Sequence, residues 1–177
     1  MKQIWSPWRM KYILSHERSS ECIFCHALED PSNDALNLVL FRGKKAFVIL
    51  NRYPYTSGHL MVVPNAHEAS LTRLDSATSA ELMALLQWTE HVLRQVYHPD
   101  GLNMGLNLGA AAGAGVVGHI HFHVVPRWEG DTNFMTAVGD ARVLPESLED
   151  TYQRLRAAWR SPLEPLPQPP LKAPHDR

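Results

Sequence analysis

Three histidines alternate with apolar residues between positions 119 and 126, where the sequence reads HIHFHVVP. In a β-strand, residues two apart share a face, so His119, His121 and His123 are expected to line one side while the apolar residues face the core. An imidazole at neutral pH can act as a nucleophile, a proton donor or a metal ligand. Each buried imidazole without a partner costs about 1–3 kcal/mol, so three core histidines are a poor explanation. One metal ion held by all three rings is a further alternative.

The chain has two cysteines, Cys22 and Cys25, in a C-x-x-C pair. In an intracellular protein this spacing indicates metal or redox chemistry rather than a structural disulfide. The pair supplies half of the four ligands of a structural zinc ion, and His26 is a neighbouring candidate ligand. A redox role is less favoured because we expect no helix to begin between the cysteines, and a helix N-terminus lowers a thiol pKa.

Residues 109–118, directly before the histidines, comprise four glycines with only alanine and valine between them. Small side chains let backbone N–H groups approach an anion closely and surround it. This composition favours a phosphate cradle beside the histidines. No Gly-Lys-Ser/Thr follows, so the segment is not a P-loop.

The elements that position these residues are predicted from hydrophobic periodicity and turn residues. Apolar runs predict five strands, at Leu36–Phe41, Ala46–Asn51, His59–Pro64, Leu102–Leu108 and His119–Pro126. Helical spacing predicts two helices, from Ser76 to about His98 and from Pro145 to Trp159. Ser79 is the expected cap of the first helix, which Pro99 ends. Hairpins around one long helix predict an α+β fold with an antiparallel sheet.

The composition is that of a single globular domain: 177 residues, 45% hydrophobic and 20% charged, are enough to bury a core without disulfides. A formal net charge of -1 argues against nucleic acid as a partner. No apolar run approaches the roughly 20 residues that span a bilayer, and no secretory signal is seen, so we expect a cytoplasmic protein. Residues 161–177 are a proline-rich tail that is expected to be flexible.

The pattern H-φ-H-φ-H-φ-φ, with φ apolar, is the signature of the histidine triad (HIT) superfamily, and residues 119–125 match it at every position. Residues 51–54 (NRYP) and 58–64 (GHLMVVP) resemble the ribose-binding hairpin and following strand of HIT hydrolases. Residues 5–10 (WSPWRM), 126–128 (PRW) and 130–134 (GDTNF) resemble bacterial HIT proteins, some of them diadenosine tetraphosphate phosphorylases. We therefore expect one HIT-like domain over residues 1–160, in which a polar segment 1–35 carries the cysteine pair.

The resemblance implies a nucleotide hydrolase or transferase that cleaves AMP-linked substrates at the α-phosphate, such as dinucleoside polyphosphates or adenosine phosphoramidates. His121 is the implied nucleophile and forms a covalent nucleotidyl-histidine, while His123 bonds the phosphoryl oxygens and His59 extends the hydrogen-bond relay. Without the resemblance, His59 is a solvent-exposed strand start and Asn51 an ordinary turn residue. The residues implied to bind the nucleotide are Asn51, Asn107, Gly113, Gly115, Val116, His121 and His123.

A structural zinc ion and a homodimer are also implied by the resemblance. The implied zinc ligands are Cys22, Cys25, His67 and His119. With His119 on the metal, His121 and His123 are available for phosphate chemistry.

One position departs from the family pattern. Hydrolases of the fragile-histidine-triad type carry a glutamine four residues before the first triad histidine, where it contacts the scissile phosphate, and this chain has Gly115 there. The loss of that side chain favours an acceptor other than water, such as inorganic phosphate. Hydrolase and phosphorylase both stay open, as does a nucleotide-binding or sensing protein with little turnover.

Overall fold

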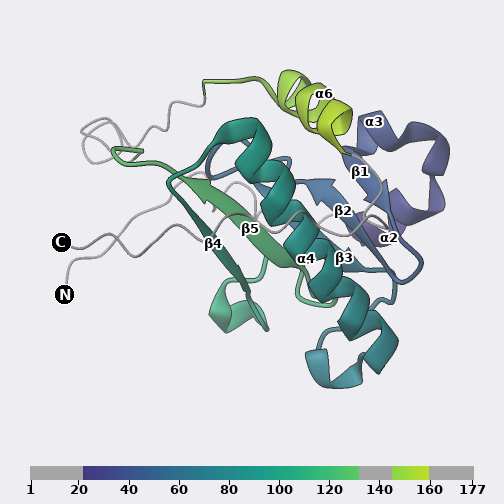
Figure 1. Ribbon diagram of the computed structural model, residues 1–177. Coiled ribbons are helices and arrows are strands. Elements are labelled where there is room, and N and C mark those ends of the chain that lie inside the picture. Colours follow the sequence, from purple (N-terminus) through teal and green to yellow (C-terminus); the bar gives the residue numbers. More distant parts are fainter. Residues whose placement is uncertain (1–21, 132–144, 160–177) are drawn as a thin grey trace, which may run out of the picture.

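The computed structural model describes residues 22–131 and 145–159 (Figure 1). The motif at residues 5–10, the end of the 130–134 motif and the predicted tail at 161–177 lie outside the described residues. In chain order the elements are α2 (Ile23–Glu29), η1 (Pro31–Asn33), α3 (Asp34–Asn37), β1 (Val39–Arg42), β2 (Ala46–Leu50), β3 (Leu60–Pro64), η2 (Leu71–Arg73), α4 (Ser76–Tyr97), β4 (Gly101–Leu106), η3 (Ala110–Ala112), β5 (Phe122–Arg127) and α6 (Leu148–Ala158).

The five strands form one antiparallel sheet in the order β1-β2-β3-β5-β4. Every residue of β2 and β3 is buried, as expected for strands that are covered on both faces. The expected α+β fold with about five antiparallel strands, one long helix and a C-terminal helix is therefore confirmed.

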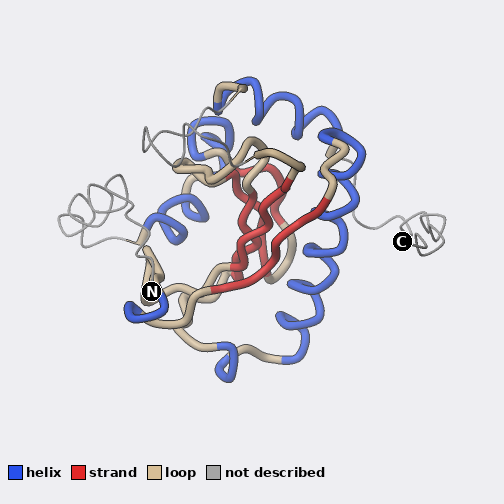
Figure 2. Tube along the Cα trace, turned by 90° about the vertical axis from the view of Figure 1, so that its left-hand side faces the viewer, coloured by secondary structure: helices blue, strands red, loops and turns tan. Residues whose placement is uncertain are grey.

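The two faces of the sheet are covered by different helices. Partners directly opposite in an antiparallel ladder share a face, so Ile49, Met61 and His123 lie on the same side. Phe47 belongs to this face too, and its ring contacts Phe24 of α2 with centroids 6.5 Å apart. The long helix α4 contacts β2, β3 and β5 and lies along the opposite side of the sheet (Figure 2). His123 thus lies on the face of the sheet that α2 covers.

Helix α4 ends as predicted but is capped by a different residue. Asp75, not Ser79, is the N-cap, and its carboxylate accepts the backbone N–H of Thr78 at 2.6 Å. At the other end His98 adopts a left-handed conformation with φ 45°, and Pro99 follows. In the described part of the chain no helix, α4 included, combines the length and the apolar character that crossing a membrane requires.

Two strands, β1 and β5, begin three residues later than the apolar pattern predicts. Residues 34–37 form α3 and Leu38 is left-handed with φ 62°, so β1 starts at Val39 rather than Leu36. The strand predicted at His119–Pro126 starts at Phe122, because the N–H of Ile120 donates to Glu68 O at 2.8 Å instead of joining the sheet. The described part of the polar segment 1–35 contains helix α2.

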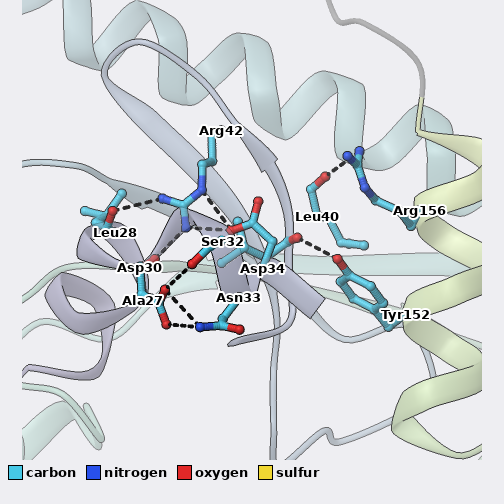
Figure 3. A network of polar contacts seen from close by, with 11 residues as sticks. Ala27, Leu28, Asp30, Ser32, Asn33, Asp34, Leu40, Arg42, Tyr152 and Arg156 are labelled. Carbon is cyan, nitrogen blue, oxygen red and sulfur yellow. Dashed lines mark hydrogen bonds and ion pairs between the residues drawn. The ribbon is translucent and has the colours of Figure 1, made fainter. Parts of the chain in front are cut away.

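The β1 edge of the sheet is protected by α6. Tyr152 donates its hydroxyl to Val39 O at 3.2 Å and Arg156 donates to Leu40 O at 3.2 Å (Figure 3). Covered edge carbonyls are not available for pairing with another chain.

Candidate active site and metal centre

The rings of three histidines lie side by side: His59 just before β3, His121 just before β5, and His123 within β5. His59 Nε2 is 3.0 Å from His123 Nδ1, and the ring centroids of His121 and His123 are 4.9 Å apart. His59 and His121 are 0% and 4% exposed, so the alternative of a solvent-exposed His59 is wrong. The structure thus brings the predicted nucleophile next to the two residues predicted to assist it.

A turn at Gly58 places His59 in this position. Gly58 has φ +77°, which a side chain rarely adopts, and a Cβ there would lie 3.0 Å from Tyr97 Cε2 of α4. The close approach of α4 to this turn fixes where β3 begins, and with it the buried position of His59.

Backbone groups assign the tautomers of His59 and His121, and the His59 ring then assigns that of His123. Tyr55 donates its N–H to His59 Nδ1 at 3.1 Å, so the proton of the neutral His59 ring is on Nε2 and is donated to His123 Nδ1. His123 in turn carries its proton on Nε2. His121 Nδ1 donates to His119 O at 2.9 Å, which leaves the Nε2 lone pair of His121 unprotonated. The arrangement provides one ring nitrogen for attack and one N–H for an anionic oxygen.

Burial keeps the rings of His59 and His121 neutral. The pKa of His59 is lowered to about 3, first by burial and then by repulsion from His123 and His121. Burial also lowers the pKa of His121, against which the hydrogen bond to the His119 carbonyl acts. A neutral imidazole is the nucleophilic form, so the site is ready for attack on phosphorus at neutral pH without an activating base.

The depressed pKa of His59 makes stability depend on pH. Below about pH 6.5 the unfolded chain binds a proton on His59 that the folded chain does not, so the free energy of unfolding falls as the pH drops from about 6.5 toward 3. We expect a loss on the order of a few kcal/mol, part of it from His121. Urea unfolding of His59→Gln between about pH 4 and 7 is expected to show a shallower pH dependence than the wild type. An unchanged slope would contradict the burial of His59.

Four side chains from three separate segments converge beside α2. Cys22 Sγ is 3.4 Å from His119 Nδ1, and Cys25 Sγ is 3.2 Å from His67 Nδ1 and 3.8 Å from His119 Nδ1. One ligand atom from each of the four residues lies within 4.8 Å of all the others. A Cβ on residue 118 would come within 3.1 Å of His67 Nε2, so Gly118 leaves the space that His67 occupies.

The donor set fits a tetrahedral zinc ion. Zn–S bonds of about 2.3 Å and Zn–N bonds of about 2.0–2.1 Å place sulfur and nitrogen ligands roughly 3.5 Å apart, close to the separations found here. His119 Nε2 also donates to Pro64 O at 2.8 Å, which directs the lone pair of Nδ1 toward the two sulfurs. The four side chains can therefore hold a metal, and two thiolates with two imidazoles are a zinc donor set.

The other metal arrangements fit less well. Among residues 22–131 and 145–159, these four form the one converging group of histidine, cysteine or acidic side chains. His26 is exposed and is not part of it. His121 and His123 are not part of it either, so one metal ion held by all three triad rings is not favoured. His119 lies against His67, with ring centroids 5.0 Å apart, and His121 lies against His123, with centroids 4.9 Å apart.

The expectation that no helix begins at the cysteine pair is wrong. Helix α2 starts at Ile23 and Cys22 is its N-cap residue. The pKa of Cys25 is nevertheless raised to about 11, because burial and the neighbouring Cys22 disfavour the thiolate. A thiol with a raised pKa is a poor redox nucleophile, whereas a bound dication would favour the thiolate that it needs as a ligand.

Two of the residues predicted to bind the nucleotide, Asn51 and Asn107, lie beside the histidines, and the roles of all of them stay predictions. Asn51 accepts the Tyr53 N–H at 2.9 Å and places its amide nitrogen 3.3 Å from His59 Nδ1. Asn107 follows the last ladder pair of β4 and β5, Leu106 with Phe122, and the same register continued by one residue places it opposite His121. The three remaining residues lie in the loop after η3, where Gly113 has φ +89°, Gly115 is exposed and Val116 packs against the core.

Sequence reasoning missed several groups that shape the site. Phe24, Tyr55 N–H and the carbonyls of Pro64 and His119 all contact a site histidine. Three of them are backbone groups, which no residue pattern reveals. The signal for Phe24 in the sequence is its position between Cys22 and Cys25, which places it beside the groups that these cysteines contact.

Comparison with known proteins agrees with this geometry. The HIT domain family model matches residues 33–130. A Mycobacterium tuberculosis protein named AP-4-A phosphorylase is 42% identical over 165 residues, which cover 90% of this chain and 85% of that protein. A zinc-bound histidine triad family protein from Mycobacterium smegmatis has a TM-score of 0.62 and 33% identity over 78% of this chain and 92% of the other.

A third similar protein is the hypothetical histidine triad nucleotide-binding protein of Sulfolobus tokodaii, with a TM-score of 0.62 and 27% identity over 77% of this chain and 91% of the other. The family model covers more than half of the chain, and its range includes the complete triad and His67. The histidine cluster, the sheet that carries it and these similarities lead to one conclusion: the chain belongs to the HIT family.

Proposed function

We propose that this protein cleaves diadenosine tetraphosphate at an α-phosphate and passes the adenylyl group from His121 to inorganic phosphate. The chain is 42% identical to AP-4-A phosphorylase over most of its length, which supports a nucleotidyl hydrolase or transferase of the HIT family. The substrate and the acceptor are our proposal. The observation that carries it is the hydrogen bond from His121 Nδ1 to His119 O, because it leaves Nε2 of a buried neutral ring as the attacking atom.

In the first step the Nε2 lone pair of His121 attacks the α-phosphorus, and the bond from phosphorus to the bridging oxygen breaks. ATP leaves as an anion, since its new terminal phosphate has a pKa near 6 and needs no full proton transfer. His121 becomes a positively charged nucleotidyl-imidazole, and its Nδ1–H still donates to the His119 carbonyl. His123 Nε2–H donates a hydrogen bond to the phosphoryl oxygens, where negative charge accumulates.

In the second step an oxygen of phosphate attacks the adenylyl phosphorus, the P–N bond breaks and ADP leaves. The two steps together convert diadenosine tetraphosphate and phosphate into ATP and ADP. Water would have to lose a proton as it attacks, whereas the phosphate dianion attacks through an oxygen that is already negative. With Gly115 in place of a glutamine that could orient water, phosphate is the better acceptor.

The proposed metal is a zinc ion held by Cys22, Cys25, His67 and His119. When bound, it supplies a structural cross-link between α2 and the segments before β5 and after β3. No step of the reaction uses it. The homodimer and the cytoplasmic location stay predictions.

Quenching the reaction tests the proposal. Diadenosine tetraphosphate labelled on its α-phosphates is mixed with the protein and stopped in alkali, in which a P–N bond survives. We expect label on His121 by peptide mapping, and ADP with ATP as products when phosphate is present. AMP with ATP at every phosphate concentration would make the protein a hydrolase. Product without any labelled histidine would exclude the covalent mechanism, and no product from any AMP-linked compound would favour a binding protein.

A further inference from the structure

One aromatic ring connects the metal-bearing helix to the proposed nucleophile. Phe24 of α2 is 1% exposed, and its ring centroid lies 5.0 Å from that of His121 and 5.3 Å from that of His119. It stands between Cys22 and Cys25 in the sequence, yet neither its chemistry nor the reaction gives it a role. Its contacts place it against the one imidazole whose orientation the reaction depends on.

The helix that carries Phe24 is held at both ends. At its start, the thiols of Cys22 and Cys25 contact the rings of His119 and His67. At its end, the guanidinium of Arg42 donates to the carbonyls of Ala27 and Leu28, at 2.5 and 3.2 Å (Figure 3). The same guanidinium forms an ion pair with Asp34 at 2.6 Å, which fixes its own position. Phe24 is therefore presented by a rigid segment.

His121 needs such a contact because one hydrogen bond, from Nδ1 to His119 O, does not by itself fix the ring. The ring can pivot by rotation about its Cα–Cβ and Cβ–Cγ bonds, and the hydrogen bond and the neighbours against the ring faces together restrain this rotation. Among the described residues, the two ring neighbours of His121 are Phe24, tilted by 47°, and His123, at 76°. In-line attack on phosphorus requires the Nε2 lone pair to be held within about 10–20° of the reacting bond.

We propose that Phe24 is a positioning residue, which holds the imidazole of His121 in the plane that attack on phosphorus requires. This rests on the proposed function insofar as His121 is the nucleophile. The contact with Phe24 limits the pivot of the ring, so that the Nδ1–H tautomer and the direction of Nε2 are kept before substrate arrives. Through α2, the orientation of the nucleophile then depends on the anchors at Arg42 and at the cysteine pair.

Phe24→Leu tests the proposal, with Phe47→Leu as the matched control. Phe47 is 0% exposed, packs in the same cluster, and has no ring contact with a histidine among the described residues. Both substitutions remove the same atoms from the same core. We expect Phe24→Leu to lower kcat about 10- to 100-fold with KM within about 2-fold, because misplacing a reactive group by about 1 Å costs roughly 100-fold. Phe47→Leu is expected to lower kcat less than about 3-fold at a comparable loss of stability.

A second measurement needs no substrate. Nitrogen chemical shifts of His121 in the free protein report its tautomer, which we expect to be a single Nδ1–H form in the wild type and in Phe47→Leu and a mixture in Phe24→Leu. Zinc content is measured for each variant, so that a fall in kcat caused by loss of the metal is distinguished from one caused by a displaced His121 ring. If Phe24→Leu does not fold, Phe24→Met, which fills more of the space, takes its place with the same expectations.

Two results would overturn the proposal: a single His121 tautomer in the Phe24 variant, or kcat values that fall equally in the Phe24 and Phe47 variants. The proposed function fails by a different measurement: the wild-type protein would carry no label on His121. The tautomer measurement does not depend on that result.

Discussion

Replacing His121 by asparagine will abolish turnover without preventing nucleotide binding. The asparagine amide keeps an N–H donor for the His119 carbonyl, but its nitrogen lone pair is delocalised into the C=O group and is not nucleophilic toward phosphorus. We expect kcat for diadenosine tetraphosphate to fall by at least about 1,000-fold, because an interaction used only in the transition state is lost. The affinity for AMP, measured by calorimetry, is expected to change by less than about 5-fold.

The control for this variant is His91→Asn on α4, where the imidazole contacts Trp88 rather than the histidine cluster. Its kcat should stay within about 2-fold of the wild type. If His121→Asn keeps a tenth of the wild-type kcat, His121 is not the nucleophile and a direct attack by phosphate takes its place. The two variants therefore separate the loss of the attacking nitrogen of His121 from any effect on kcat of replacing a histidine elsewhere in the fold.

Removing the metal is expected to have the second large effect, on stability rather than on the chemical step. Cys22→Ala leaves three of the four converging ligands, and we expect the zinc content to drop from about one per chain to near zero. When free zinc is at about 1,000 times its Kd, binding adds roughly 4 kcal/mol to the free energy of unfolding. The Tm should therefore fall on the order of 10 °C for a chain of this size. Metal analysis and calorimetry measure both quantities.

The matched control is His26→Ala, next to the site but outside the converging group. It should retain both the zinc and the wild-type Tm. A strong chelator should lower the Tm of the wild type to that of Cys22→Ala and leave the variant unchanged. Retention of one zinc per chain in Cys22→Ala would show that the metal is bound elsewhere, and a loss of zinc in His26→Ala would bring His26 into the site.

Much of this molecule follows from residue order alone. Alternation at residues 119–125 and the C-x-x-C pair single out the chemistry, because imidazoles and thiols in such patterns have few packing explanations. The apolar spacing in α4 and the runs in β2 and β3 predict the fold class, because each element buries a continuous face. These signals are local: they depend on residues within one helix or strand.

What the tertiary structure decided is where those groups point. His119 leaves the strand pattern because Glu68 takes the N–H of Ile120 and Pro64 takes the ring nitrogen, so one triad histidine joins the cysteines and two stay together. The tautomers of His59 and His121 likewise depend on the backbone of Tyr55 and His119. Backbone N–H and C=O groups are the same in every sequence, so a residue pattern can name the imidazoles, and only the folded chain decides which nitrogen of each carries the proton.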